Sequence, residues 1–290
     1  MTDTATTCRL CGSKNLKALF TAKGFPVAQC QNCSFAQVTR APDAAELEAI
    51  YNEAYFGHNK YRDLRTLAVE NARRLKLMQR YVPAGARALE AGCGSGFFLE
   101  AAANTYQMYG FDLSAVGIEQ ARERNPAIAK RIQQGTLENL PLFDGSAFDV
   151  ICLWDTIEHV WQPLEALRGL FARLKPGGYL LFSTPDIGAP TARLLGTRWA
   201  FMTPPEHLSF LNRQSTRYLV ETALGHRIVF QASWGKQVNL GFLLYKVRRV
   251  LPALMPAALL RPFERPPLAK LALYVPTADI QYVVIQKTGN

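Results

Sequence analysis

The 290-residue sequence contains no apolar run long enough to cross a membrane, because the longest one, residues 251–260, is broken by Pro252 and Pro256. A membrane-spanning helix needs roughly 18 to 20 consecutive apolar residues. The N-terminal sequence also lacks the charged and then apolar pattern of a secretory signal. We therefore expect a cytoplasmic protein, in a reducing compartment where disulfides are rare.

Acidic residues are scarce relative to basic ones, 23 against 33, which leaves a net charge of +10. This excess favours nucleic acid, phosphate-bearing substrates or a membrane surface as partners, and it also fits a merely solvated basic surface. The apolar fraction of 49% and the charged fraction of 19% indicate a globular chain. Its length accommodates one full α/β domain and a small module.

Cysteines are few after the N-terminal region, where two Cys-x2-Cys pairs lie 18 residues apart: Cys8, Cys11, Cys30 and Cys33. Each pair directs two sulfurs toward one point, and Zn²⁺ prefers four thiolates at tetrahedral corners. Two disulfides or four free thiols are the alternatives. The spacing predicts a zinc ribbon over residues 1–40, with a structural ion that supplies its folding energy.

Apolar periodicity predicts alternating strands and helices after the ribbon. The strand candidates are Arg87–Ala91, Met108–Phe111, Val150–Leu153, Tyr179–Phe182, Arg227–Gln231 and Gln281–Ile285. The helix candidates are 43–56, 60–81, Phe97–Tyr106, Val116–Arg124, Leu164–Leu174 and Ser215–Leu224. This alternation predicts a doubly wound α/β fold, with a mostly parallel sheet covered by helices on both faces.

The clearest chemical motif follows the first of these strands. There the chain reads Glu90-Ala-Gly92-Cys-Gly94-Ser-Gly96, and Asp112 ends the next strand. Glycines let the backbone turn sharply and let a ligand approach closely. A carboxylate at the end of the second strand can accept hydrogen bonds from both hydroxyls of a ribose.

With its downstream segments, this motif resembles the class I S-adenosylmethionine-dependent methyltransferases over roughly residues 85–230. The further matching segments are Phe111-Asp-Leu-Ser114, Gly135-Thr-Leu-Glu-Asn-Leu-Pro141, Phe148-Asp-Val150, Glu158-His-Val160 and Leu174-Lys-Pro-Gly-Gly178. The resemblance implies a Rossmann-like sheet of seven strands whose last strand, near Asp279–Lys287, is antiparallel. It implies the domains 1–40 (zinc ribbon), 41–84 (helical linker and cofactor-site cover) and 85–290 (methyltransferase).

The same resemblance implies the contacts of S-adenosylmethionine. Gly92, Gly94 and Gly96 would pass beneath its methionine and ribose, and Asp112 would bind the ribose. The adenine would contact Leu113, Thr136 and Leu137, although Thr136 stands where the family often has Asp. Glu90 would orient the glycine loop or reach the methionine end through water.

The acceptor side carries five titratable candidates: Asp155, Glu158, His159, Glu206 and His207. The segment Glu206-His-Leu-Ser-Phe210 is similar to one in sugar methyltransferases that also carry a four-cysteine zinc module, where the histidine is a proposed acid/base. We therefore expect His207 to be the base or an acceptor-binding group, and otherwise to hold a lid loop. His159 and Asp155 are the other catalytic candidates.

The acceptor is less clearly indicated. Those sugar C-methyltransferases carry a further C-terminal domain, whereas this chain ends at Asn290, so we expect methyl transfer to oxygen rather than carbon of a small-molecule, glycan or lipid-linked acceptor. The insertion 236–273 mixes apolar and basic residues, which suits a peripheral contact at the inner membrane face, a lid or a dimer surface. An rRNA or tRNA methyltransferase that binds RNA through its ribbon, and a non-catalytic cofactor-binding module, are the alternatives.

Overall fold

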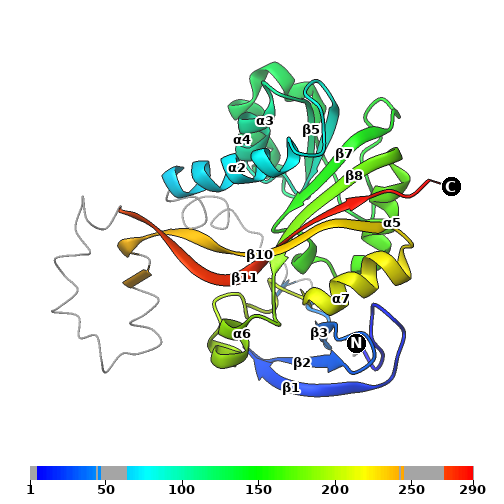
Figure 1. The fold of residues 1–290 in the computed structure, drawn as a ribbon, viewed down its shortest axis with the longest axis vertical. Helices are drawn as coiled ribbons and strands as arrows, with labels where there is room; N and C mark the ends of the chain where they lie inside the picture. The colour runs from blue at the N-terminus through cyan, green and yellow to red at the C-terminus, as the bar shows by residue number, and fades with distance from the viewer. Residues whose placement is uncertain (1–4, 44, 47–63, 242, 245–270, 290) are drawn as a thin grey trace.

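The computed structural model describes residues 5–43, 45–46, 64–241, 243–244 and 271–289. It contains a large seven-stranded sheet and a small four-stranded sheet, which Figure 1 shows at opposite ends of the molecule. The predicted helix 43–56 and the start of the predicted helix 60–81 fall largely outside the described residues. In the described part, no helix is long and apolar enough to cross a membrane.

The large sheet has the strand order β10-β11-β8-β7-β4-β5-β6. Its strands are β4 (Arg87–Ala91), β5 (Gln107–Asp112), β6 (Ile132–Gln134), β7 (Phe148–Trp154), β8 (Leu174–Pro185), β10 (Arg227–Asn239) and β11 (Ala272–Gln286). The pairs among β4 to β8 are parallel, whereas β11 runs antiparallel to both β8 and β10. This confirms the expected seven-stranded sheet with an antiparallel last strand.

Helices cover both faces of this sheet. They are α2 (Leu64–Met78), α3 (Phe97–Ala102), α4 (Ala115–Arg124), α5 (Pro163–Ala172) and α7 (Arg213–Arg217), whereas α6 (Pro190–Leu195) packs with the core of the small sheet. One apolar core joins α2, α3 and α4 to the sheet, and the other joins α5 and the π-helical turn Tyr218–Ala223. Strand β7 contributes side chains to both cores. Val150 and Cys152 face the core with α2, α3 and α4, and Ile151 and Leu153 face the core with α5.

The element limits differ from the prediction in several places. The three-residue strand β6 was missed, because it is too short to show a period. The predicted helix Ser215–Leu224 is divided between α7 and the π-helical turn. The insertion is shorter than 236–273, since β10 continues to Asn239 and pairs there with Ala272 at the start of β11. Strand pairing overrides the apolar and basic pattern at both ends of that segment.

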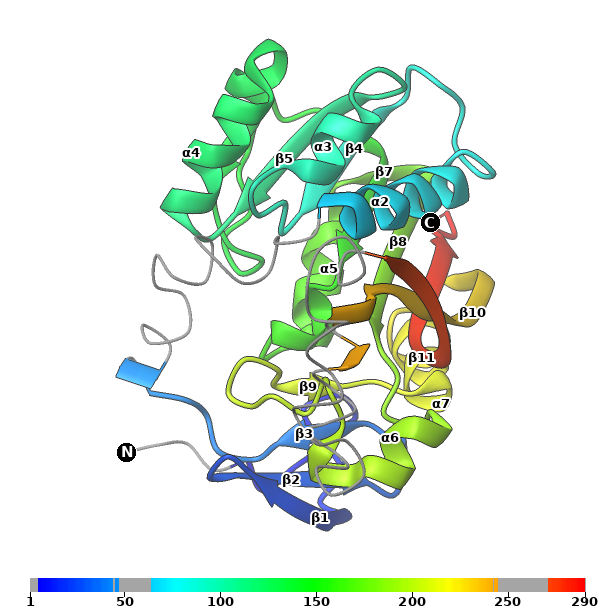
Figure 2. The same ribbon diagram turned by 90° about the vertical axis from the view of Figure 1, so that its left-hand side faces the viewer.

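The small sheet consists of β1 (Leu16–Ala22), β2 (Phe25–Cys30), β3 (Ala36–Val38) and β9 (Ser209–Phe210). All of its neighbouring strands pair antiparallel. Strand β9 comes from a segment more than 160 residues downstream of β3. The predicted boundary at residue 40 therefore assigns β9 to a different unit from the sheet that it completes (Figure 2).

Candidate active site and four-cysteine cluster

A cavity of about 880 Å³ lies at the carboxyl ends of β4, β5 and β7. The strand order reverses here, because β5 and β7 flank β4 on opposite sides. Such a switch point is where doubly wound sheets bind ligands. The volume is near the upper end of the roughly 300–1,000 Å³ range for small-molecule sites, so it has room for a cofactor and an acceptor.

The glycine turn forms one wall of this cavity. Gly92 has a φ of 78°, and a Cβ added there would lie 2.6 Å from Thr156 Oγ1. Gly94 and Gly96 also have positive φ, and the amide of Gly94 donates to Asp112 Oδ2 over 2.8 Å. The second carboxylate oxygen of Asp112 accepts from the amide of Ser114 over 2.9 Å. These bonds fix Asp112 against the turn at the cavity wall.

The remaining predicted cofactor residues line the same end of the cavity. The side chain of Leu113 is 47% exposed. Thr136 and Leu137 lie opposite it in the loop after β6, where Thr136 Oγ1 accepts from the amide of Asn139. The structure thus brings together Glu90, Gly92, Asp112, Leu113, Thr136 and Leu137 around one cavity, with Gly94 and Gly96 in the adjoining turn.

A buried charge network forms the floor of the cavity. Burial raises the pKa of Glu90 well above its usual value, and one of its oxygens, Oε2, has no hydrogen-bond partner among the described atoms. Arg74 of α2 forms an ion pair with Asp155, next to Glu90. Burial disfavours the charge of Arg74, but Asp155, Tyr282, Glu70 and Glu90 raise its pKa overall. The unpartnered Glu90 oxygen fits a polar cofactor group in this cavity.

Asp155 follows β7, as predicted, and lines the cavity. Its φ of 52° is unusual for a residue other than glycine, and such a conformation costs about 1–2 kcal/mol. Ser183 Oγ donates to Asp155 Oδ1 over 2.7 Å, and Arg74 binds the other oxygen. Arg74 was missed from the sequence, since its helix reads as a basic amphipathic helix with a solvated polar face.

The two predicted histidines lie side by side, with ring centroids 4.8 Å apart and perpendicular planes. His159 lines the cavity, whereas His207 is 7% exposed and lies behind it. Glu158 and His159 belong to a 3-10 turn, Ile157–His159, which precedes α5. Pro163 at the first position of α5 places that helix start after the turn.

With His159, aromatic and basic side chains line a part of the cavity that we call the acceptor end: Trp161, Phe201 and Lys236. The ammonium of Lys236 lies 4.1 Å from the centroid of the Phe201 ring. Burial lowers the pKa of Lys236, against the opposing effect of Asp279 and Asp155. Lys236 was interpreted as part of the basic insertion, but its place in β10 directs it to the cavity.

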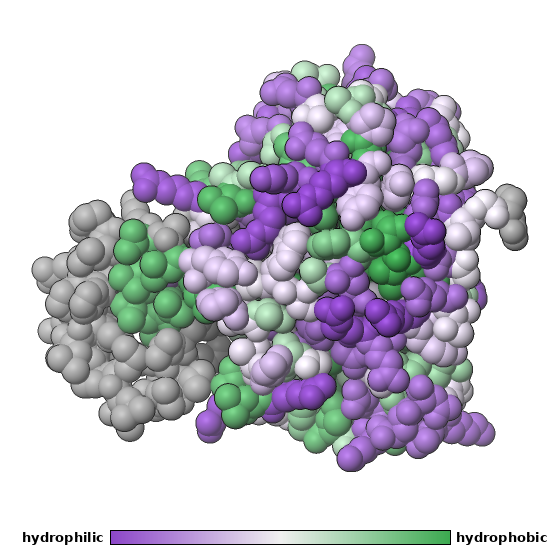
Figure 3. All heavy atoms as spheres, in the orientation of Figure 1, coloured by the Kyte–Doolittle hydropathy of each residue, from purple (hydrophilic) through white to green (hydrophobic). Residues whose placement is uncertain are grey.

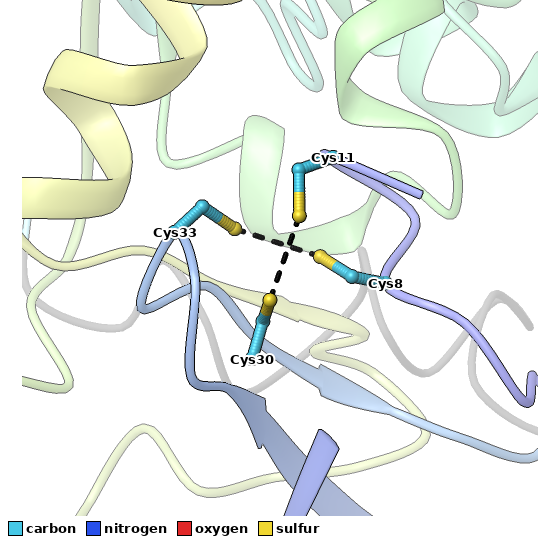
Figure 4. Close-up of side chains that lie close together, drawn as sticks. All are labelled: Cys8, Cys11, Cys30 and Cys33. Atoms are coloured by element: carbon cyan, nitrogen blue, oxygen red, sulfur yellow. Dashed lines mark hydrogen bonds between the residues drawn. The ribbon is translucent and has the colours of Figure 1, made fainter. Parts of the chain in front are cut away.

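The four cysteines converge as the spacing predicts. Figure 4 shows their sulfurs pointing toward one centre, with Sγ–Sγ distances of 3.6 Å for Cys8–Cys33 and 3.5 Å for Cys11–Cys30. A tetrahedron with Zn–S bonds of about 2.3 Å has edges of about 3.8 Å. The hydrogen bond with Cys33 lowers the pKa of the Cys8 thiol. This donor set fits Zn²⁺.

Arg9 connects the cysteine cluster to the cavity. It lies between Cys8 and Cys11, and its guanidinium donates to the carbonyl oxygens of Val38 and Leu208 over 2.5 Å and 2.7 Å. The guanidinium carbon lies 3.5 Å from the ring centroid of Trp161. Trp161 and Leu208 both line the cavity. The turn between Cys8 and Cys11 thus supports the wall at the acceptor end of the cavity, which Trp161 and Leu208 form.

A doubly wound sheet with this cavity and glycine turn defines a class of enzymes that bind a nucleoside cofactor. The family model of a methyltransferase domain matches residues 55–224, more than half of the chain, and the chain belongs to this family. The curated proteins that the chain matches include ones named as S-adenosylmethionine-dependent methyltransferases and O-methyltransferases.

Two curated relatives illustrate the likeness. The chain is 36% identical over 104 residues to a probable S-adenosylmethionine-dependent methyltransferase of Mycolicibacterium smegmatis, covering 36% of this chain and 39% of the relative. It is 30% identical over 146 residues to a ubiquinone biosynthesis O-methyltransferase of Ralstonia nicotianae, covering 49% and 61%. The matches therefore span less than two thirds of either relative.

Solved structures share the fold. Magnesium protoporphyrin IX methyltransferase of Synechocystis PCC 6803, with bound SAH, has a TM-score of 0.55 at 12% identity and covers 85% of this chain and 100% of its own. YcgJ of Bacillus subtilis has a TM-score of 0.53 at 18% identity, with coverages of 76% and 100%. A [4+2]-cyclase has a TM-score of 0.51 at 17% identity, covering 86% and 98%. The sheet alone therefore does not fix the reaction.

Proposed function

We propose that the enzyme moves the methyl group of S-adenosylmethionine to an oxygen of a small-molecule or lipid-linked acceptor. The observation that carries the proposal is the cavity of about 880 Å³, with the glycine turn and Asp112 at one end and His159, Trp161 and Lys236 at the other. The names of several curated relatives, which are ubiquinone biosynthesis O-methyltransferases, support oxygen over carbon.

In this proposal the cofactor end holds the ribose at Asp112 and the adenine between Leu113 and the 136–137 loop. The buried Glu90 and Arg74 bind and orient the methionine end. The cofactor supplies an activated methyl group, so the protein chiefly positions the acceptor oxygen in line behind it. Asp155 and His159, which both line the cavity beside this point, are the groups that can take the acceptor proton.

Lys236 suggests the chemical character of the acceptor. Among the ion pairs of the described residues, none involves Lys236. A partly desolvated ammonium at the acceptor end favours a ligand with a phosphate or carboxylate group. A lipid-linked or glycan phosphate would meet this requirement, as would a free organic acid.

The far end of the β10–β11 ribbon is consistent with a lipid-linked acceptor. Leu271 and Tyr274 there are 52% and 48% exposed, and Figure 3 shows a hydrophobic patch at this end, away from the body of the molecule. Exposed apolar side chains beside basic ones favour a membrane surface. Most of the insertion itself, residues 245–270, lies outside the described residues, so the proposed peripheral membrane contact awaits a vesicle-binding test.

We also propose that the four-cysteine cluster holds a structural zinc ion. A closed set of four thiolates leaves no position for a substrate. Its role is to hold β1–β3 and Arg9 against the acceptor wall. In the alternative function, an rRNA or tRNA methyltransferase, the same module would bind RNA. The net charge of +10 is the observation that supports this alternative.

The test is a methyl-transfer assay with labelled cofactor on extracts of lipid, glycan and RNA from cells that lack the gene. Label in a lipid or small-molecule hydroxyl supports the proposal, whereas label in RNA overturns it. Lys236→Met should raise KM for an anionic acceptor by roughly 10-fold or more and leave KM for its neutral analogue unchanged. Lys175→Met, on the surface at the start of β8, is the matched control.

A further inference from the structure

Three potential metal ligands meet behind the acceptor wall: Glu158, His159 and His207. Each offers one ligand atom, and these atoms lie within 4.8 Å of one another. The backbone holds the two segments together, because the amide of Leu208 donates to the carbonyl oxygen of Glu158 over 2.8 Å. Ser209 Oγ also donates to the carbonyl oxygen of Val160 over 2.7 Å. The cluster is therefore built into the fold and is not a chance meeting of surface side chains.

Both imidazole rings are oriented by backbone carbonyl groups. His159 Nδ1 lies 2.9 Å from the oxygen of Glu206, and His207 Nδ1 lies 2.7 Å from the oxygen of Phe201. A carbonyl oxygen can only accept a hydrogen bond, so each Nδ1 carries the proton. In the neutral ring the lone pair then belongs to Nε2. Histidines that bind metal through one nitrogen typically donate the other N–H to a carbonyl or carboxylate in this way.

Glu158 adds a carboxylate to the two imidazoles. Its side chain is 3% exposed, and its Oε2 accepts from Thr184 Oγ1 over 3.0 Å. A buried carboxylate is costly unless it is hydrogen-bonded, paired with a charge or bound to a metal. Two histidines and one carboxylate, with further coordination positions open, are typical of sites for divalent transition metals.

We propose that Glu158, His159 and His207 bind a divalent transition-metal ion at the acceptor end of the cavity. This second metal site is separate from the four cysteines, and its catalytic use rests on the proposed methyl transfer to oxygen. His159 lines the cavity and His207 lies behind it, so an ion shared by the two rings would lie at the cavity wall. As a ligand His207 needs no direct contact with the acceptor, which a general base does.

The ion would act on the acceptor hydroxyl. A divalent ion lowers the pKa of an oxygen that binds it, so the hydroxyl can lose its proton near neutral pH. With His159 bound to the ion, the proton would pass to Asp155 at the cavity wall or to water. The oxygen lone pair then forms the new O–CH₃ bond, and the electrons of the S–CH₃ bond remain on sulfur. The sulfonium becomes a neutral thioether, and one proton is released for each methyl group transferred.

The experiment counts ions in the purified full-length protein after loading with Co²⁺ alone. We expect two ions per chain, one with the thiolate-to-metal absorption of the cysteine cluster and one without it. Glu158→Gln and His207→Asn should each remove the second ion and keep the first. Glu165→Gln on the exposed face of α5 and His226→Asn near the C-terminus are matched controls that should bind two. Cofactor titration checks that each variant is folded.

The outcomes separate this proposal from the proposed function. A wild-type chain that binds one ion, through thiolates alone, overturns the second site. The same holds if His207→Asn still binds two ions but loses turnover, because His207 is then a base and methyl transfer stands. If two ions bind and the two variants lose one, the site is supported, even where no methyl transfer to oxygen is found and the proposed function fails.

Discussion

The two ends of the cavity are built in different ways. The predicted cofactor end comes from one short stretch, residues 90–137, in which each loop follows its own strand. The acceptor end combines the turn after β7, the segment 201–208 and residues of β10, and it is supported by Arg9 of the cysteine module. In the proposed function, local segments bind the cofactor, which methyltransferases share, and distant segments form the acceptor end, which differs between them.

This difference predicts how the two ends respond to damage. The glycine turn and Asp112 are held by backbone bonds within one β-α-β unit, so local changes should affect the cofactor alone. The acceptor wall depends on contacts between segments up to 199 residues apart. Changes far from the cavity should therefore affect the acceptor and leave the cofactor bound.

Removal of the metal from the cysteine cluster should give the largest effect. Structural zinc contributes roughly 10–16 kcal/mol of apparent binding free energy in small domains. We expect Cys8→Ser with Cys11→Ser to abolish zinc binding and expose β1–β3 to limited proteolysis, while S-adenosylmethionine still binds. Elemental analysis and calorimetric titration measure the two effects. Full zinc content in this variant would remove the cluster assignment.

Gly92→Ala tests the cofactor end. The new methyl group would lie 2.6 Å from Thr156 Oγ1, in a backbone conformation with a φ of 78°. Backbone strain and overpacking each cost about 1–3 kcal/mol, so cofactor affinity should fall by a factor of roughly 100 or more. Gly145→Ala has a φ of 77° with nothing within 4 Å and lies away from the cavity, so it should lower the free energy of unfolding and leave cofactor affinity unchanged. Unchanged cofactor affinity in Gly92→Ala would show that the cofactor does not depend on this turn.

Asp112→Ala should have a smaller effect on the same ligand. Loss of the carboxylate removes partners of the ribose hydroxyls and of two backbone amides, at a cost of about 1–3 kcal/mol. We expect the Kd for S-adenosylmethionine to rise by roughly 5- to 150-fold in a binding titration. Asp144→Ala, in the exposed loop before β7, should leave the Kd unchanged. An unchanged Kd for Asp112→Ala would mean that the ribose binds elsewhere.

Arg9→Met should give the smallest effect, and it compares the acceptor end of the cavity with the cofactor end most directly. The change removes two hydrogen bonds and the contact with Trp161, and it acts on the acceptor only through the cavity wall, so we expect acceptor binding to weaken by about 1 kcal/mol. The KM for the acceptor should rise, while zinc content and the Kd for the cofactor stay the same. If the cofactor Kd changes instead, the two ends of the cavity are not independent.

The sequence predicted which local segments meet around one end of the cavity, because the signals in those segments are local. The strand Arg87–Ala91 was predicted with its observed limits, and the glycine turn and Asp112 face one cavity as expected. Arg74, Lys236 and Arg9 were not assigned to the site. Each is a basic residue on an element that reads as ordinary surface, and only distant packing brings it to the cavity.

The sequence by itself determined the alternating fold, the convergence of the four cysteines and the glycine turn, because short-range spacing and turn chemistry fix these features. The tertiary structure alone decided that β9 completes the cysteine sheet, that Arg9 supports Trp161, and that His207 lies beside Glu158 and His159. Such contacts depend on how separate elements pack on the sheet. The local periodicity of a sequence does not predict contacts between elements that are far apart in the chain.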